Sequence, residues 1–223
     1  MAYIGKKPAA AALTSSDISD GIITNAKLAQ DIISADTALG AEPADTDEFL
    51  VSDAGVLKRM DYSYIKGGGY TQATAVSASG STISFTGIPA GTKSILITGQ
   101  NLSTDSGAGS DFKMTIGDSG GLETSSYSSV DMYRGSGGDT GFNTSTSYFK
   151  MSHGFSASDV WSWNIMLQHI SSNFWVSTYL AQDITEYGRR GCGHKQLSGE
   201  LTQLQFAFTN GSFDNGTINI MYQ

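Results

Sequence analysis

The sequence has little cysteine, little proline and few charged residues. Cys192 is the single cysteine among 223 residues, so no disulfide can form within the chain, which predicts synthesis in a reducing cytoplasm. Only 3 prolines and 15% charged residues accompany 27 glycines. This composition favours short strands joined by turns over long charged helices.

No apolar run is long enough for a membrane span or a secretory signal. The run from Ala9 to Leu13 follows the basic Lys6 and Lys7, but it is shorter than the apolar core of a signal peptide. The formal net charge of −8 would repel a phosphate backbone. We therefore expect neither membrane insertion nor nucleic acid binding.

The length allows one substantial core and a smaller appended segment. Three glycines at positions 67–69 are typical of a hinge, so we expect an N-terminal segment at 1–69 and a β-domain at 70–223. We expect residues 1–12 to be an extended leader, because Pro8 disfavours helix before it. Such a leader either frays or docks on a partner. The residues expected to dock are Tyr3, Ile4, Lys6 and Lys7.

Apolar residues at spacings of four, three and four predict a short amphipathic helix within the N-terminal segment. They form one stripe that matches two heptads of a coiled coil: Leu28, Ile32, Ala35 and Leu39. Asn25 and Gly40 are suited to cap its two ends. Such a short helix is marginal in water, so either the chain's own core or copies of the helix in a homo-oligomer must cover the stripe.

A β-hairpin is predicted just after this helix. Phe49–Val51 and Val56–Met60 are short apolar strands, and Asp53-Ala54-Gly55 has the composition of a tight turn between them. A single hairpin is not stable in water. It too must pack against the main domain or against other chains.

From Tyr70 onward, apolar and polar residues alternate as in half-buried strands. The expected strands lie at Ile83–Phe85, Ser94–Thr98, Phe112–Ile116, Tyr148–Met151, Trp161–Leu167, Trp175–Leu180, Leu204–Phe208 and Ile218–Tyr222. The last two are expected to pair with each other across a loop from Asn210 to Gly216. Eight or more antiparallel strands without a helical pattern predict a mainly β fold, a sandwich of jelly-roll type.

One motif resembles a catalytic sequence. Residues Gly117 to Gly121 read GDSGG, as around the nucleophilic serine of chymotrypsin-like proteases. That family has its histidine before the serine, whereas all three histidines here follow Ser119, and a serine without a base is a weak nucleophile. We expect a tight glycine turn after the Phe112–Ile116 strand and no catalytic residue.

Metal sites are weakly indicated. Cys192 and His194 have the spacing of two ligands, but no second pair stands nearby to complete a tetrahedron, unless three chains of a trimer contribute. The alternative is a plain loop among glycines 188, 191 and 193. Several acids are scattered without calcium-loop spacing: Asp105, Asp111, Asp118, Asp131 and Asp139. We expect neither a metal nor another cofactor.

Aromatic residues beside polar, glycine- and serine-rich segments favour binding of a sugar, which needs flat apolar contact and hydrogen bonds. The candidates for such a receptor or glycan site are Tyr127, Tyr133, Tyr148, Trp175 and Tyr179. The alternative is that most of them belong to the core of the sandwich.

Five blocks spread over nearly the whole chain carry a resemblance to a known family. They are MAYIGKKP at the start, DISDGIITNAKLA from Asp17, ADTDEFLVSDAGVLKRM from Ala44, IGDSGGLETSSY from Ile116 and FDNGTINIMYQ from Phe213. In these blocks the chain resembles bacteriophage virion appendage proteins, chiefly short tail fibres and related receptor-binding or head-decorating fibres.

This resemblance implies a homotrimer that attaches to other virion proteins by its N-terminus and presents its β-domain to a host-surface glycan or protein. It implies localisation in the virion after synthesis in the host cytoplasm without a signal peptide. A capsid decoration protein is the alternative within the same class. A polysaccharide-degrading enzyme is a further alternative, although the chain lacks the repetitive β-helix of such tailspikes.

Overall fold

The computed structural model describes residues 14, 16, 18, 19 and 37–223, apart from 108, 135–139, 185 and 186. The chain divides into two compact units, residues 1–67 and 68–223. The predicted docking residues of the leader, and three of the four stripe residues of the predicted helix, lie outside the described residues: Tyr3, Ile4, Lys6, Lys7, Leu28, Ile32 and Ala35.

The fourth residue of the helical stripe does not lie in a helix. Residues 37–40 have no regular structure, and the Leu39 side chain is 67% exposed. The prediction that the helix extends to Leu39 and ends at Gly40 is therefore wrong at this end. The physical reason is that a short helix is marginal in water and needs an apolar face to bury, whereas most of the Leu39 side chain is exposed.

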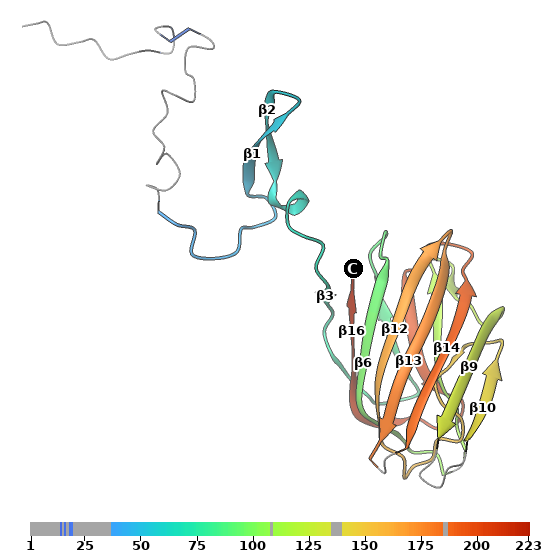
Figure 1. Cartoon of the computed structure of the whole chain (residues 1–223). Helices are drawn as coiled ribbons and strands as arrows, with labels where there is room; N and C mark the ends of the chain where they lie inside the picture. The colour runs from blue at the N-terminus through green and yellow to red at the C-terminus, as the bar shows by residue number, and fades with distance from the viewer. Residues whose placement is uncertain are drawn as a thin grey trace, which may run out of the picture. The chain divides into compact units, whose positions relative to one another are not determined.

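The first unit contains the predicted hairpin (Figure 1). Strands β1 (Glu48–Asp53) and β2 (Val56–Asp61) pair antiparallel, with Phe49 opposite Met60, and η3 (Tyr62–Tyr64), a single 3₁₀ turn, follows. Ala54 and Gly55 form the two-residue turn, and both have positive φ, at 49° and 83°. These angles are those of a type I′ turn, whose twist matches that of the strands it joins. The hairpin prediction is confirmed.

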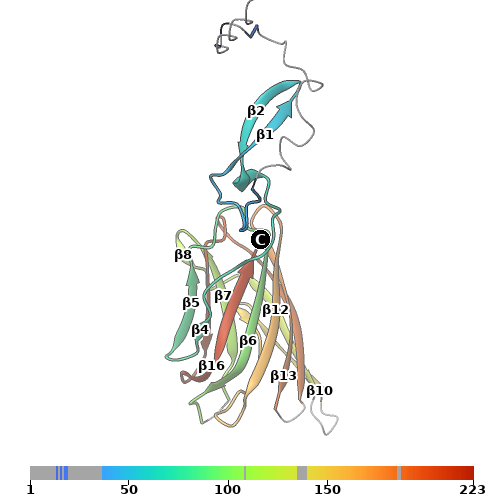
Figure 2. The ribbon, with the colours of Figure 1, turned by 90° about the vertical axis from the view of Figure 1, so that its left-hand side faces the viewer.

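The second unit is mainly β, and its strands form two antiparallel sheets (Figures 1 and 2). The larger sheet has the order β10-β9-β14-β13-β12-β6-β16-β3, with β4 also paired to β16. Its strands are β3 (Thr71–Gln72), β4 (Val76–Ser77), β6 (Ser94–Thr104), β9 (Tyr127–Arg134), β10 (Thr140–Ser145), β12 (Trp161–Ser171), β13 (Phe174–Asp183), β14 (Gly188–Gln196) and β16 (Phe213–Tyr222).

The smaller sheet has the order β11-β7-β15-β5, with β8 also paired to β7. Its strands are β5 (Thr82–Thr86), β7 (Phe112–Asp118), β8 (Gly121–Leu122), β11 (Phe149–Lys150) and β15 (Gln203–Phe208). Figure 2 shows the two sheets as separate layers, which makes this unit a β-sandwich, as the alternating pattern predicts. None of the helices among the described residues is long and apolar enough to cross a membrane.

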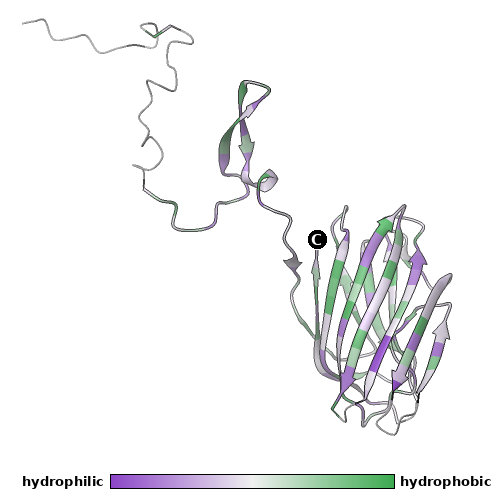
Figure 3. Cartoon of the chain, viewed as in Figure 1, coloured by the Kyte–Doolittle hydropathy of each residue, from purple (hydrophilic) through white to green (hydrophobic). Residues whose placement is uncertain are grey.

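The core lies between the two sheets and is rich in aromatic rings. Phe112 on β7 contacts Trp163 on β12 and Phe213 on β16, with ring centroids 5.0 and 6.1 Å apart, so it joins the two layers. Figure 3 shows apolar and polar positions alternating along the long strands. In β12 this alternation is regular from Trp161 to Gln168, with every second residue buried. The predicted strand follows from this period of two.

The predicted pairing of the last two strands is wrong. β15 lies between β5 and β7 in the smaller sheet, whereas β16 lies between β6 and β3 in the larger one. The chain crosses from one layer to the other between them, and Phe208 and Phe213 meet across the core at 4.7 Å. Both strands carry enough buried apolar residues to need neighbours on both sides, which a two-stranded hairpin does not provide.

Candidate functional site

The carboxylate of Asp131, on the inner face of β9, binds side chains from β13 and β14 and so links three adjacent strands of the larger sheet. It is fully buried, it accepts a hydrogen bond from the Tyr179 hydroxyl on β13, and its Oδ2 lies 2.7 Å from Nη1 of Arg189 on β14. The Arg189 guanidinium also lies over the rings of Tyr133 and Trp161, at 5.4 and 5.2 Å. The buried charges of Asp131 and Arg189 are therefore paired with each other.

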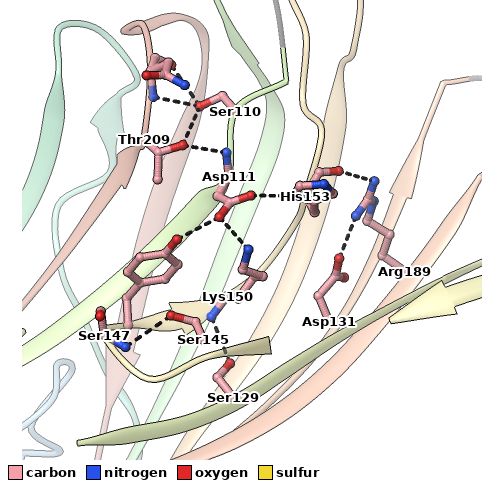
Figure 4. A network of polar contacts seen from close by, with 12 residues as sticks. Ser110, Asp111, Ser129, Asp131, Ser145, Ser147, Lys150, His153, Arg189 and Thr209 are labelled. Atoms are coloured by element: carbon pink, nitrogen blue, oxygen red, sulfur yellow. Dashed lines mark hydrogen bonds and ion pairs between the residues drawn. The ribbon is translucent and has the colours of Figure 1, made fainter. Parts of the chain in front are cut away.

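A second polar cluster links this pair to the smaller sheet (Figure 4). Asp111 accepts hydrogen bonds from the Tyr148 hydroxyl at 2.7 Å and from Lys150 Nζ at 2.5 Å, and His153 Nδ1 lies 2.9 Å from its other oxygen. The carbonyl of His153 accepts a hydrogen bond from Arg189 at 2.8 Å. The two carboxylates thus belong to one continuous network between the layers.

The two carboxyl groups of this network have opposite pKa shifts. Burial raises the pKa of Asp131, and hydrogen bonds from Tyr179 and Arg189 only partly offset it. Burial also acts to raise the pKa of Asp111, but hydrogen bonds from Lys150, Tyr148 and His153 outweigh it and lower that pKa. Burial, together with the hydrogen bond to Asp111, raises the pKa of Tyr148 to about 12. Asp111 is therefore the carboxylate that stabilises the folded state in its charged form.

Replacing Asp111 with asparagine is expected to lower the free energy of unfolding by about 2 to 3 kcal/mol at pH 7, because the nearly buried Lys150 loses its counter-ion. The pKa of Asp111 is lower in the folded state than in the unfolded state, so the stability that its charged form contributes is complete above about pH 4. This stability is lost as the pH falls through the folded-state pKa. Denaturant unfolding of both proteins between pH 7 and pH 3 measures this. A difference that stays constant with pH would contradict it, and the exposed Asp53→Asn serves as control.

On the outer face of the same strands lies an open groove of about 1120 Å³, which we call the arginine groove. It is lined by residues of β9, β10, β13 and β14, the last four strands at one side of the larger sheet. Its apolar members include Val130, Met132, Phe142 and Leu180. Phe142 and Leu180 are 73% and 66% exposed, so the groove presents apolar surface to solvent.

Three of the chain's four arginines line this groove: Arg134, Arg189 and Arg190. The guanidinium of Arg189 is held on the inner face by Asp131. Arg134 and Arg190 occupy the alternate, outward positions of β9 and β14 and are exposed. Neither has an ion pair with any of the described residues.

Three of the five predicted aromatic residues lie in the core and are not available to a surface ligand. Tyr127, Trp175 and Tyr179 are only 4%, 2% and 4% exposed, so the prediction that they bind a receptor is corrected. Their side chains point inward because each occupies a buried position of an alternating strand. Tyr148 is half-buried, and its hydroxyl is engaged by Asp111. Tyr133 is half-buried and belongs to the arginine groove.

The serine of the protease-like motif sits in a turn. Ser119 and Gly120 connect β7 to β8, with Asp118 opposite Gly121, which confirms the predicted tight turn. Asp118 accepts hydrogen bonds from the Gly120 amide and the Ser198 hydroxyl. Its Oδ1 thus stabilises the turn, and its Oδ2 links the turn to Ser198.

The predicted loop among glycines 188, 191 and 193 is wrong, because these residues belong to β14. A side chain at Gly191 would begin 2.3 Å from the Tyr179 ring, and one at Gly193 would begin 2.6 Å from the Ser128 carbonyl oxygen. Cys192 and His194 both point outward from this strand, and His194 stacks on Phe174 at 5.2 Å. In the described part of the chain, no three His, Cys, Asp or Glu residues gather in a way that could hold a metal ion.

Four residues of the groove were not predicted from the sequence: Phe142, Leu180, Arg134 and Arg190. They come from four strands, and only the sheet register brings them together: Phe142 is opposite Met132, Met132 is opposite Arg190, and Arg190 is opposite Leu180. One feature of the sequence does indicate a positively charged site: three of the four arginines lie within positions 134–190 in a chain of net charge −8.

Comparison with known proteins adds no assignment. No protein-family model matches the chain, and no curated protein matches it.

Proposed function

We propose that this chain is a non-enzymatic structural protein of a bacteriophage particle, a short homotrimeric tail fibre. In this proposal residues 1–69 attach to the virion and register three chains, and residues 70–223 present the β-sandwich to the host surface. The partners are two further copies of the chain, other virion proteins, and a glycan or protein of the host. The sequence resemblance described above supports the class of protein.

The observation that carries the proposal is the apolar surface of the hairpin. No described residue of the first unit covers either face of the hairpin, and Leu50 and Leu57 are 75% and 68% exposed. Leu50 is opposite Arg59 and Leu57 is opposite Ser52, so the two leucines are diagonal neighbours on one face. A two-stranded hairpin with such a surface gains stability by association, and copies of itself supply matching apolar faces.

The topology of the second unit supports the jelly-roll-like form of the proposed sandwich. β5, β7 and β15 lie in the smaller sheet, whereas β6 and β16, which directly follow β5 and β15, lie in the larger sheet. Connections that change sheets in this way are typical of Greek-key and jelly-roll sandwiches.

Replacing Leu50 and Leu57 with lysine is expected to weaken the trimer about tenfold or more, because six charges would enter the apolar contact of three hairpins. Light scattering across a dilution series of the full chain measures this, with a wild-type mass about three times 23.5 kDa. Ser63→Lys, at an exposed position just after the hairpin, is the control. A wild-type chain that is monomeric at every concentration would contradict the proposed trimer.

A further inference from the structure

Arg134 and Arg190 form a pair of neighbouring positive charges on the outer face of the sheet. Arg134 is opposite Gly188 and Arg190 is opposite Met132, so the two arginines are diagonal neighbours on adjacent strands. Long side chains at such positions reach one another, and two like charges there repel. The arrangement therefore becomes favourable when an anion lies between or beside the two guanidinium groups.

Among the described residues, β9, β13 and β14 provide no carboxylate on the face that carries these arginines. Asp131 on β9 and Asp183 on β13 both occupy inward, buried positions. Asp131 is already engaged by Arg189 and Tyr179. Among the described residues, the outer face of these strands thus combines unpaired positive charge with apolar surface.

The apolar residues of the groove lie beside its arginines on the same face of the sheet. Phe142, Met132, Arg190 and Leu180 form one row across four strands, because each is opposite the next in the sheet register. The Phe142 ring is exposed and suited to pack against the apolar face of a sugar ring. The volume of about 1120 Å³ slightly exceeds the usual range of small-ligand sites, about 300 to 1,000 Å³, which fits an extended ligand of several rings.

We propose that the arginine groove binds an acidic oligosaccharide, with Arg134 and Arg190 holding its anionic groups and Phe142 packing against a sugar ring. A guanidinium group binds a carboxylate through two parallel hydrogen bonds, which selects a charged sugar over a neutral one. A nucleic acid is disfavoured because the net charge of −8 repels a long phosphate backbone. This proposal rests on the proposed host-surface role and names the ligand class of that role.

The test uses the full-length chain and isothermal titration with a short oligogalacturonate, a sulfated oligosaccharide of similar length, and the methyl ester of the oligogalacturonate. The ester keeps the sugar rings and removes their charge. Binding of the free acid or of the sulfated sugar, with at least about tenfold weaker binding of the ester, is expected. Failure to bind either anionic sugar, or equal binding of the ester, would overturn the proposal.

Arg134→Gln and Arg190→Gln are each expected to weaken binding of the anionic sugar by about tenfold or more. Arg59→Gln is the matched control, because Arg59 is the remaining arginine, lies on the hairpin and changes the net charge by the same amount. Its effect is expected to stay within about twofold, since Arg59 is exposed, already pairs with Glu48 and does not line the groove. An equal loss in all three variants would show only general charge attraction and overturn the site.

A polyglutamate of similar length distinguishes a sugar site from a site for acidic peptides. Equally tight binding of this peptide would overturn the assignment to a sugar.

The titration with the free acid and its ester can fail independently of the proposed function. A trimeric virion protein that does not distinguish the free acid from its ester leaves the fibre proposal intact, whereas a sugar-binding chain that is absent from the particle contradicts the fibre proposal alone.

Discussion

Replacing Phe112 with alanine is expected to lower the free energy of unfolding by about 3 to 5 kcal/mol. The Phe112 side chain is 1% exposed and packs against rings from both sheets, including Trp163, Phe208 and Phe213. Its removal leaves a cavity where the two layers meet, and rigid aromatic neighbours on opposite sheets cannot collapse to fill it. The loss is a large fraction of the total stability of about 5 to 15 kcal/mol of a typical domain.

Denaturant unfolding monitored by tryptophan fluorescence measures the effect of this substitution. Phe142→Ala is the matched control, because it removes the same side chain from a position that is 73% exposed. Its effect is expected to stay within about 0.5 kcal/mol. If the two substitutions cost the same, Phe112 does not join the two sheets as described.

Replacing Asp131 with alanine is expected to cost about 3 to 5 kcal/mol, because it leaves the largely buried Arg189 without a counter-ion. The same change also releases the Tyr179 hydroxyl, which donates to Asp131. Three strands, β9, β13 and β14, would lose their common polar partner. Since these strands also carry the arginine groove, we expect weaker binding of an acidic sugar in the same variant.

The double variant Asp131→Ala with Arg189→Met distinguishes a broken pair from a general packing defect. Replacing both partners removes the unpaired charge, so the double variant is expected to be more stable than Asp131→Ala alone by about 1 kcal/mol or more. Breaking the exposed pair of Lys58 and Asp53 with Asp53→Ala is expected to cost less than about 1 kcal/mol. A double variant less stable than the single one would contradict this account of the network.

The sequence predicts those elements in which the local order of apolar and polar residues matches the burial of their side chains. The alternation of Trp161, Trp163 and Ile165 with polar residues predicts β12 because one face of that strand is buried and the other is exposed. The hairpin is predicted because Ala54-Gly55 suits a tight turn between two apolar strands. In both cases the information is local.

Strand β14 and the pairing of β15 and β16 were not predictable in this way. Gly191 and Gly193 leave room for the Tyr179 ring and the β9 backbone, so the core at these positions is filled from neighbouring strands. The glycine-rich sequence of β14 therefore resembles that of a loop. The partner of each strand depends on distant segments, and β15 pairs with β5 more than a hundred residues earlier.

The arginine groove was beyond sequence analysis for a similar reason. The aromatic residues beside serine and glycine suggested a binding surface, but Tyr127, Trp175 and Tyr179 occupy inward positions. The exposed Phe142 was overlooked because β10 is short and polar, with the sequence TGFNTS. Only the register of four strands shows that Phe142 and Arg190 lie on the same face.

We propose for this chain the role of a phage tail fibre whose β-sandwich faces outward from the particle. Imaging of intact particles with an antibody raised against the β-domain of residues 68–223 tests this role. We expect label at the tail, accessible without disruption of the particle. Label over the head would assign the chain to capsid decoration instead of a fibre, and particles that remain unlabelled while the purified chain is recognised would contradict the claim that it belongs to the virion surface.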